Sequence, residues 1–173
     1  SGVWQIVLNP TRVVEGQYDL WLPSENVLNR GTGFLYPDEE VTLTIPSTAD
    51  KVISVGAYDA LTFSYASFSG RGYTWQDERT KPDLVAPGVN VRTTAVGGGV
   101  TVVSGTSFAT PFVTGASALL MEWGIVRGND PFLYGEKVKA YLRRGARELP
   151  GFGKYPNREV GYGRLCLERS LPD

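Results

Sequence analysis

Residues 104–115 read SGTSFATPFVTG, a glycine-containing turn followed at once by a mostly apolar segment. Apolar side chains continue at spacings of three and four as far as Trp123, which predicts a helix over about 107–123. Gly105 is expected to allow the bend that enters this helix, and Gly124 to end it. The segment therefore predicts a turn-to-helix junction with Ser107 at its opening.

Ser107 has two interpretations at this junction. The first N–H groups of a helix lack internal acceptors and point outward at the positive end of the helix dipole. A serine placed there projects its hydroxyl from a rigid support, and its own N–H can stabilise an oxyanion that forms beside it. The structural alternative is that Ser107 is simply the N-cap, a common role of a serine before a helix.

The composition excludes several kinds of chemistry. The 173 residues include no histidine, so no Ser-His or Cys-His catalytic pair and no histidine-based zinc site can form within this chain. The single cysteine, Cys166, cannot form an internal disulfide, and we expect no metal and no cofactor. A net charge of −1 and short apolar runs also predict no nucleic-acid partner and no membrane span.

Beyond residue 51 the pattern is typical of an α/β fold with a parallel sheet. Residues 52–57, VISVGA, form a short β-branched run that suits a strand buried on both faces. Further strands are predicted at 89–94 and 100–103, a turn at 86–88, and a second helix over about 133–144. Pro111 is acceptable near the start of the first helix, where its missing N–H costs little.

Residues 1–45 have a different texture. Apolar and polar residues alternate around 3–8, 18–22 and 41–45. This period of two predicts short antiparallel strands, and Trp4 and Trp21 are expected in their core rather than at a ligand site.

Four strings, in a consistent order, carry a resemblance to a known family. SGTSFATPFVTG closely resembles the nucleophile signature of the subtilisin-like serine proteases, or subtilases, and KPDLVAPG at 81–88 resembles the segment that precedes it. VISVGAYD at 52–59 with YASFS at 65–69 resembles an internal strand and its loop, and GYG at 161–163 resembles the closing segment. The resemblance implies the C-terminal part of a subtilisin-like parallel-sheet domain.

In that family the catalytic residues follow the chain order Asp, His, Ser. The resemblance implies that Ser107 is the nucleophile, that Gly105 and Thr106 shape the turn and support the oxyanion site, and that Pro111 fixes the helix start. It also implies that the Asp, the His and the oxyanion-hole Asn lie upstream of residue 1. The family often has histidine after the signature proline, where this chain has Phe112; that histidine is not the triad base.

The beginning of the chain resembles the end of a jelly-roll insertion in the Csp-type branch of clostridial germination proteases. SGVW at 1–4 and YDLWLP at 18–23 carry this resemblance. It divides the chain into an insertion over 1–46 and part of the catalytic domain over 47–173. In that branch the insertion is thought to stabilise the protease. A bacterial source is implied, and the compartment stays open between cytoplasmic and spore-associated.

Because the chain has no histidine, the isolated polypeptide is expected to show no appreciable protease activity. A Ser-Lys pair with Lys51 or Lys81 is disfavoured, and the KPDLVAPG string argues against the related sedolisins, which use Glu and Asp. Four acidic residues are predicted to be surface or turn residues rather than catalytic ones: Asp59, Asp77, Glu78 and Asp83.

The expected partners are a polypeptide substrate and the upstream N-terminal part of the same protease. Without that part, apolar surface should be exposed, so we expect oligomerisation or strand exchange of the chain alone. Two alternatives stay open: a pseudoprotease that acts by binding or signalling, and a cleavage product that remains bound to its N-terminal partner.

Overall fold

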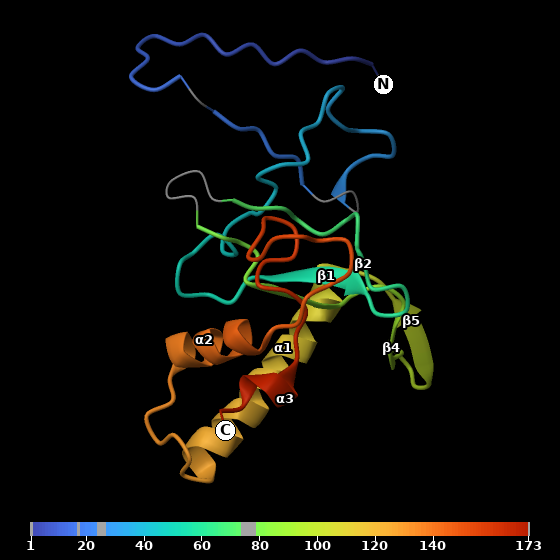
Figure 1. The fold of residues 1–173 in the computed structure, drawn as a ribbon. Helices are drawn as coiled ribbons and strands as arrows, with labels where there is room; N and C mark the ends of the chain where they lie inside the picture. Colours follow the sequence, from blue (N-terminus) through green and yellow to red (C-terminus); the bar gives the residue numbers. More distant parts are fainter. Residues whose placement is uncertain (1, 17, 24–26, 74–78, 173) are drawn as a thin grey trace. The chain divides into compact units, whose positions relative to one another are not determined.

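A computed structural model describes residues 2–16, 18–23, 27–73 and 79–172. The chain divides into two units, Ser1–Pro37 and Asp38–Asp173. The second unit holds every helix and strand that the structure describes, and it carries the candidate site (Figure 1).

The centre of the second unit is a three-stranded sheet with the order β2-β1-β3. β1 (Val55–Asp59) runs parallel to β3 (Leu84–Pro87) and antiparallel to the short β2 (Ser64–Tyr65). The middle of β1 and most of β3 are buried, as the apolar run of residues 52–57 predicts for a strand covered on both faces. The predicted strand is therefore present, and it begins at Val55.

A separate hairpin joins β4 (Val91–Thr94) to β5 (Val100–Val103), with Val91 opposite Val103. These strands confirm the two predicted over 89–94 and 100–103. The connecting turn contains three consecutive glycines with positive φ angles of 83°, 103° and 83°, a conformation that glycine adopts without a Cβ penalty.

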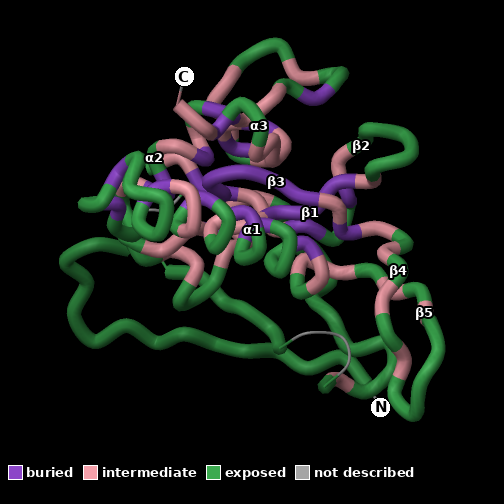
Figure 2. Tube along the Cα trace, turned by 90° about the horizontal axis from the view of Figure 1, so that it is seen from below, coloured by how far each residue is buried: buried purple, intermediate pink, exposed green. Residues whose placement is uncertain are grey.

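Helix α1 (Thr106–Met121) packs against β1 and β3. Its buried face consists of Ala109, Val113, Ala116 and Leu120, at the spacing of one side of a helix. A π-turn, η2 (Glu122–Val126), continues it. Figure 2 shows the buried residues gathered on β1, β3 and the adjoining side of this helix.

The stretch from Thr106 to Val126 is long and apolar enough to cross a membrane by length and composition alone. The core helix of a sheet-containing protein meets the same criterion, and one face of α1 is packed on the sheet. This property therefore assigns no membrane role.

Two further helices follow. α2 (Gly135–Gly145) confirms the second predicted helix, and α3 (Leu167–Ser170) packs against it. Val138 and Leu142 of α2 are buried, while Arg143 and Arg144 lie in its last turn, at the negative end of the helix dipole.

The predicted turn at 86–88 is partly wrong, because β3 extends through Ala86 and Pro87. Pro87 is the last residue of the strand, where the absence of its N–H leaves the inner part of the ladder intact. The N–H of Gly88 then donates to the carbonyl of Tyr58 at 3.0 Å, so the pairing with β1 continues one residue past the strand.

The prediction of antiparallel strands over 1–45 is wrong for the residues that the structure describes there. None of these residues belongs to a strand, and the side chains of Trp4 and Trp21, expected in a core, are 91% and 51% exposed. An alternating pattern specifies which face of a strand is apolar, but a strand also needs a neighbour to complete its hydrogen bonds. The boundary at residue 46 and the jelly-roll assignment stay predictions.

Candidate active site around Ser107

Ser107 lies in the opening turn of α1, where it is exposed to solvent. The N-cap of the helix is Gly105, with φ at 154°, and no side chain caps the helix by a hydrogen bond. The alternative in which Ser107 acts as the N-cap is therefore wrong. Its hydroxyl does not cap the helix and is exposed.

Two of the first four backbone N–H groups of α1 also have no acceptor among the described residues. The N–H groups of Phe108 and Ala109 both donate to the carbonyl of Gly105, at 3.1 and 3.3 Å. The N–H groups of Thr106 and Ser107 donate to no acceptor among the described residues. The hydroxyl of Ser107 therefore stands beside two unpaired donors at the positive end of a helix, a suitable place for an oxyanion.

The loop that follows β3 holds this turn in place. The N–H of Gly105 donates to the carbonyl of Gly88 at 2.8 Å, and the N–H of Asn90 donates to Ser104 Oγ at 2.9 Å. A Cβ at Gly88 would lie 2.6 Å from the Cβ of Ala57 and 3.0 Å from the carbonyl oxygen of Gly105, so glycine is required for this approach. The turn thus lies past the carboxyl ends of two parallel strands, where α/β proteins bind their ligands.

The structure brings Gly105, Thr106 and Ser107 together at the junction and places Pro111 further along the helix. Pro111 follows the first full turn, so its missing N–H would have bonded the carbonyl of Ser107. The expectation that it lies where its N–H is not needed is wrong. Thr110 Oγ1 donates to the carbonyl of Thr106 at 3.0 Å and supports this irregular first turn.

Neither lysine considered as a base is placed to act on Ser107. Lys81 is 1% exposed, and its Nζ donates to Asp83 Oδ2 at 3.0 Å and to the carbonyl of Val52 at 2.9 Å. It precedes β3, whereas the Ser107 turn follows β3, a separation on the order of 20 Å at about 3.3 Å per residue. Lys51 is exposed and lies 3.8 Å from Glu136.

The prediction that Asp83 is a surface or turn residue is wrong, because it is completely buried. Its carboxylate accepts from the N–H of Ser54 at 2.6 Å and from Arg143 Nε at 2.8 Å, besides the bond from Lys81. Lys139 Nζ lies 3.3 Å away. We call Lys81, Asp83, Lys139 and Arg143 the Asp83 cluster.

Of the other acidic residues, Asp59 behaves as predicted. It ends β1 and accepts from the N–H of Leu61 at 2.8 Å, which is a turn interaction. Asp77 and Glu78 lie outside the described residues.

The Asp83 cluster is the feature that the sequence analysis missed. It gathers three cations around one buried carboxylate. Burial lowers the pKa of the Lys139 ammonium, and the charges of Lys81 and Arg143 lower it further, against the opposing effect of Asp83. A signal was available, since Lys81 and Asp83 directly precede a fully apolar strand, where charged residues need partners.

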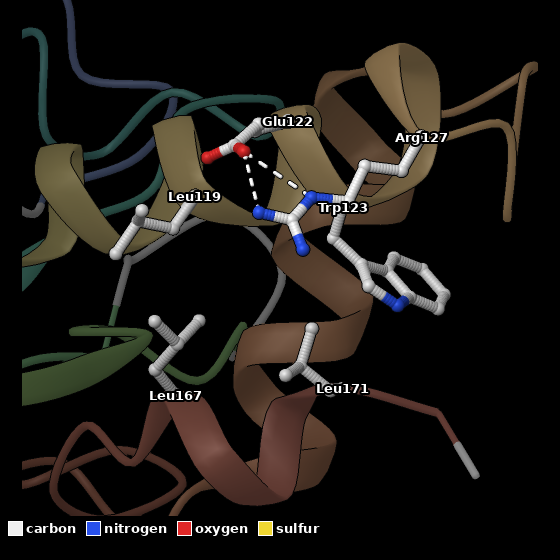
Figure 3. Close-up of a pocket in the computed structure, with 6 residues that line it drawn as sticks. All are labelled: Leu119, Glu122, Trp123, Arg127, Leu167 and Leu171. Carbon is white, nitrogen blue, oxygen red and sulfur yellow. Dashed lines mark hydrogen bonds and ion pairs between the residues drawn. The ribbon is translucent and has the colours of Figure 1, made fainter.

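Two hollows lie along α1. The first has a volume of about 270 Å³ and adjoins the Ser107 turn; its lining residues are Val91, Arg92, Thr93, Phe108, Pro111 and Phe112. The second, of about 230 Å³, lies at the other end of the helix against α3 (Figure 3). There Leu119, Leu167 and Leu171 face one another under an ion pair in which Arg127 Nη2 and Glu122 Oε1 are 2.8 Å apart. Among the residues that the structure describes, no group of three or more Cys, Asp or Glu could hold a metal ion.

Comparison with known proteins shows the family to which this chain belongs. The model of the subtilase family, Peptidase S8, matches residues 35–163, and the chain belongs to this family. The resemblance derived from the four sequence strings is therefore confirmed.

Among solved structures, the CspB protease of Clostridium perfringens is 50% identical with a TM-score of 0.78, over 83% of this chain and 30% of that one. Serine protease AprX of Bacillus subtilis is 34% identical over 79% of this chain and 33% of its own length. The membrane-bound transcription factor site-1 protease of Mus musculus is 39% identical over 75% of this chain and 12% of its own length. The chain therefore spans a third or less of each of these relatives.

Proposed function

We propose that this chain is the nucleophile-bearing part of a subtilisin-like serine endopeptidase of the Csp type, with Ser107 as the nucleophile. The observation that carries the proposal is the exposed hydroxyl of Ser107 in the first turn of α1, next to two N–H groups that have no acceptor among the described residues. Family membership and the 50% identity to the CspB protease support it.

In the proposed reaction, Ser107 Oγ attacks the carbonyl carbon of a peptide bond and forms a tetrahedral intermediate. A base accepts the hydroxyl proton and later donates it to the leaving amine. The N–H of Ser107 stabilises the oxyanion, because it belongs to the first turn of α1 and donates to no acceptor among the described residues. Since the sequence has no histidine, the imidazole base must come from polypeptide outside this chain. The resemblance to subtilases implies that the Asp and the oxyanion-hole Asn also lie upstream.

The surface of α1 supports a partner that covers it. This helix is apolar around most of its circumference, yet Phe112, Leu119 and Met121 are 43%, 52% and 42% exposed. A helix that is apolar on all sides is normally buried. We infer that the remaining part of the subtilase domain packs here, and that residues 1–46 end a jelly-roll insertion whose strands pair with that part.

This function is tested by labelling and turnover. We expect the protease that contains this chain to cleave a fluorogenic peptide and to be labelled at Ser107 by a fluorophosphonate, and both to disappear in Ser107→Ala. The isolated 173-residue chain should do neither at a measurable rate, because it has no base. Turnover by the isolated chain that Ser107→Ala abolishes would refute the need for an external histidine. A folded full-length protein without labelling or turnover would favour a pseudoprotease.

A further inference from the structure

The sheet continues past β3 through two isolated bridges, and the outer bridge joins two arginines. Arg164 pairs in parallel with Val85 of β3 and, on its other side, in an antiparallel bridge with Arg147. In this second bridge each arginine donates its N–H to the carbonyl of the other, at 2.9 and 2.7 Å. Residues paired in this way have Cα atoms about 5.5 Å apart and side chains on the same face of the sheet. Two guanidinium groups therefore project from one face.

The face that carries these two side chains is turned away from α1. Leu84 and Ala86 of β3 pack in the cluster that contains the buried side of α1, whereas Val85 packs with Tyr58 in a separate cluster. Successive residues of a strand point to opposite faces, and Arg164 shares the face of its partner Val85. The arginine pair is thus separate from the surface of α1 that the rest of the subtilase domain is inferred to cover.

The charges of this pair are poorly compensated. Arg164 makes no ion pair with the described residues, and its Nε is buried without an acceptor among them. Arg147 Nη2 is 3.6 Å from Glu168 Oε2, an exposed carboxylate, and such surface pairs contribute little. Like charges directly opposite each other destabilise a sheet, and a buried donor without an acceptor costs free energy. One additional acceptor would relieve both costs.

Phe63 holds the guanidinium of Arg164 in place. The Cζ atom of Arg164 lies 5.0 Å from the centre of the Phe63 ring, and this ring stacks in turn on Tyr58, with 6.4 Å between the centroids. A guanidinium that stacks on an aromatic ring keeps the N–H donors of its edge directed to a further partner. Phe63 is exposed and Arg164 is partly exposed, so a small ligand can approach from solvent.

The surrounding part of the chain is basic. Residues 135–172 contain nine lysine and arginine residues against four glutamates, although the whole chain has a net charge of −1. A local excess of positive charge raises the concentration of anions near it. Arginine is also suited to oxoanions, because its planar fork of donors matches two oxygen atoms of a phosphate or carboxylate.

We propose that Arg147 and Arg164 form a binding site for a small oxoanion from solution, which bridges the two guanidinium groups. The anion supplies the acceptor that Arg164 lacks and offsets the repulsion between the two charges. It thereby stabilises the attachment of the two outer segments to β3. This role requires neither Ser107 nor proteolysis, so it stands or falls separately from the proposed function.

The binding experiment titrates inorganic phosphate into the full-length protein by calorimetry, with chloride at matched ionic strength as the reference. We expect a saturable site that Arg164→Gln weakens by about tenfold or more, the size of one lost hydrogen bond to a charged group. Arg164→Lys keeps the charge without the fork, so it should recover only part of this loss. Arg127→Gln is the matched control, since this exposed arginine on η2 is paired with Glu122, and it should bind phosphate as the wild type does.

Thermal melting separates anion binding from a purely structural role of Arg164. Phosphate should raise the melting temperature of the wild-type protein, because a ligand that binds only the folded state stabilises it, and should have little effect on Arg164→Gln. In phosphate-free buffer this variant should melt close to the wild type, since it loses a repulsion as well as the contact with Phe63. Arg147→Gln should behave in the same way.

Several results would overturn the proposal. Equal phosphate affinity in the wild type and in folded Arg164→Gln would place the anion elsewhere. A loss of stability in Arg164→Gln that is the same with and without phosphate would leave the arginine a structural role only. No phosphate binding by the wild type, together with such a loss, would indicate that a carboxylate of the upstream polypeptide takes this position. Binding that depends on both arginines supports the site even if Ser107 is neither labelled nor active.

Discussion

The two ends of β3 differ in how completely their polar groups are satisfied. Before Leu84, the carboxylate of Asp83 is completely buried and surrounded by donors, with three cations and a backbone N–H around it. After Pro87, Gly88 holds a turn that leads to an exposed hydroxyl and to two N–H groups with no acceptor in the described part of the chain. One strand thus joins a region built for stability to a region kept open for chemistry, and changes at the two ends should have separable effects.

The largest expected effect is at the end of β3 that leads to Ser107, which we call the open end. In the full-length protease, Ser107→Ala should lower kcat by about 10⁴- to 10⁶-fold, because loss of the nucleophile leaves only binding and oxyanion stabilisation. The melting temperature should stay nearly the same, since the side chain is exposed and makes no capping hydrogen bond. Rates with a chromogenic peptide and calorimetry measure the two quantities, and a large loss of stability would contradict the separation.

The next effect is at the other end of β3, where Asp83 is buried, which we call the closed end. Asp83→Asn should lower the free energy of unfolding by about 3–5 kcal/mol, because it leaves three cations near a site with no compensating charge. Glu168→Gln is the matched control, since this carboxylate is 86% exposed and lies 3.6 Å from Arg147, and it should cost less than about 1 kcal/mol. Urea unfolding of both variants tests the difference, and equal costs would mean that the Asp83 cluster contributes little.

Gly88→Ala tests the link between the strand and the Ser107 turn. The added methyl group would meet Ala57 and the carbonyl of Gly105, so we expect a loss of about 1–3 kcal/mol together with reduced kcat. Gly135→Ala is the control, because nothing lies within 4 Å of its added Cβ, it begins α2 rather than α1, and alanine favours a helix. A Gly88→Ala protein with native stability and activity would show that the turn does not depend on this approach.

The smallest effect concerns the charge of Lys139. As the pH rises through the lowered pKa of folded Lys139, the native state releases this proton before the unfolded chain, whose lysines titrate near 10.4. The unfolded state then binds more protons, so the free energy of unfolding contains a component that rises with pH in this alkaline window. Lys139→Met should remove that component. Parallel slopes for both proteins at alkaline pH below about 10.4 would contradict the assignment.

The open end of β3 was largely predictable from the sequence. The string SGTSFATPFVTG fixes a turn and an apolar helix within a few residues, and both are local properties of glycine placement and hydrophobic spacing. The strands β4 and β5 were likewise predictable from their local sequence. The position of Pro111 was misjudged because, even in a helix that begins at Ser107, residue 111 lies beyond the first turn and its N–H would bond the carbonyl of Ser107.

Charged residues before an apolar strand indicate that Asp83 needs partners, but neither the identity of those partners nor the structure at the beginning of the chain was predictable on these grounds. Alternating residues in 1–45 indicated strands, but no described residue there forms one, because pairing depends on a neighbour that a local pattern does not specify. Asp83 was predicted to be a surface or turn residue, whereas it is completely buried. Its partner Arg143 comes from α2, far along the sequence, and its burial follows from how α2 packs.

The sequence by itself determined the subtilase family, the turn-to-helix junction at Ser107 and the absence of a histidine, because each depends on residue identity or on spacing within one segment. Only the tertiary structure decided that Gly105 rather than Ser107 caps the helix, that Gly88 supports its turn, that Asp83 is surrounded by cations, and that Phe112 and Arg92 line one groove. Apart from the helix cap, these features join residues that are distant in sequence, and their energies depend on burial and close approach, which exist only after the chain has packed.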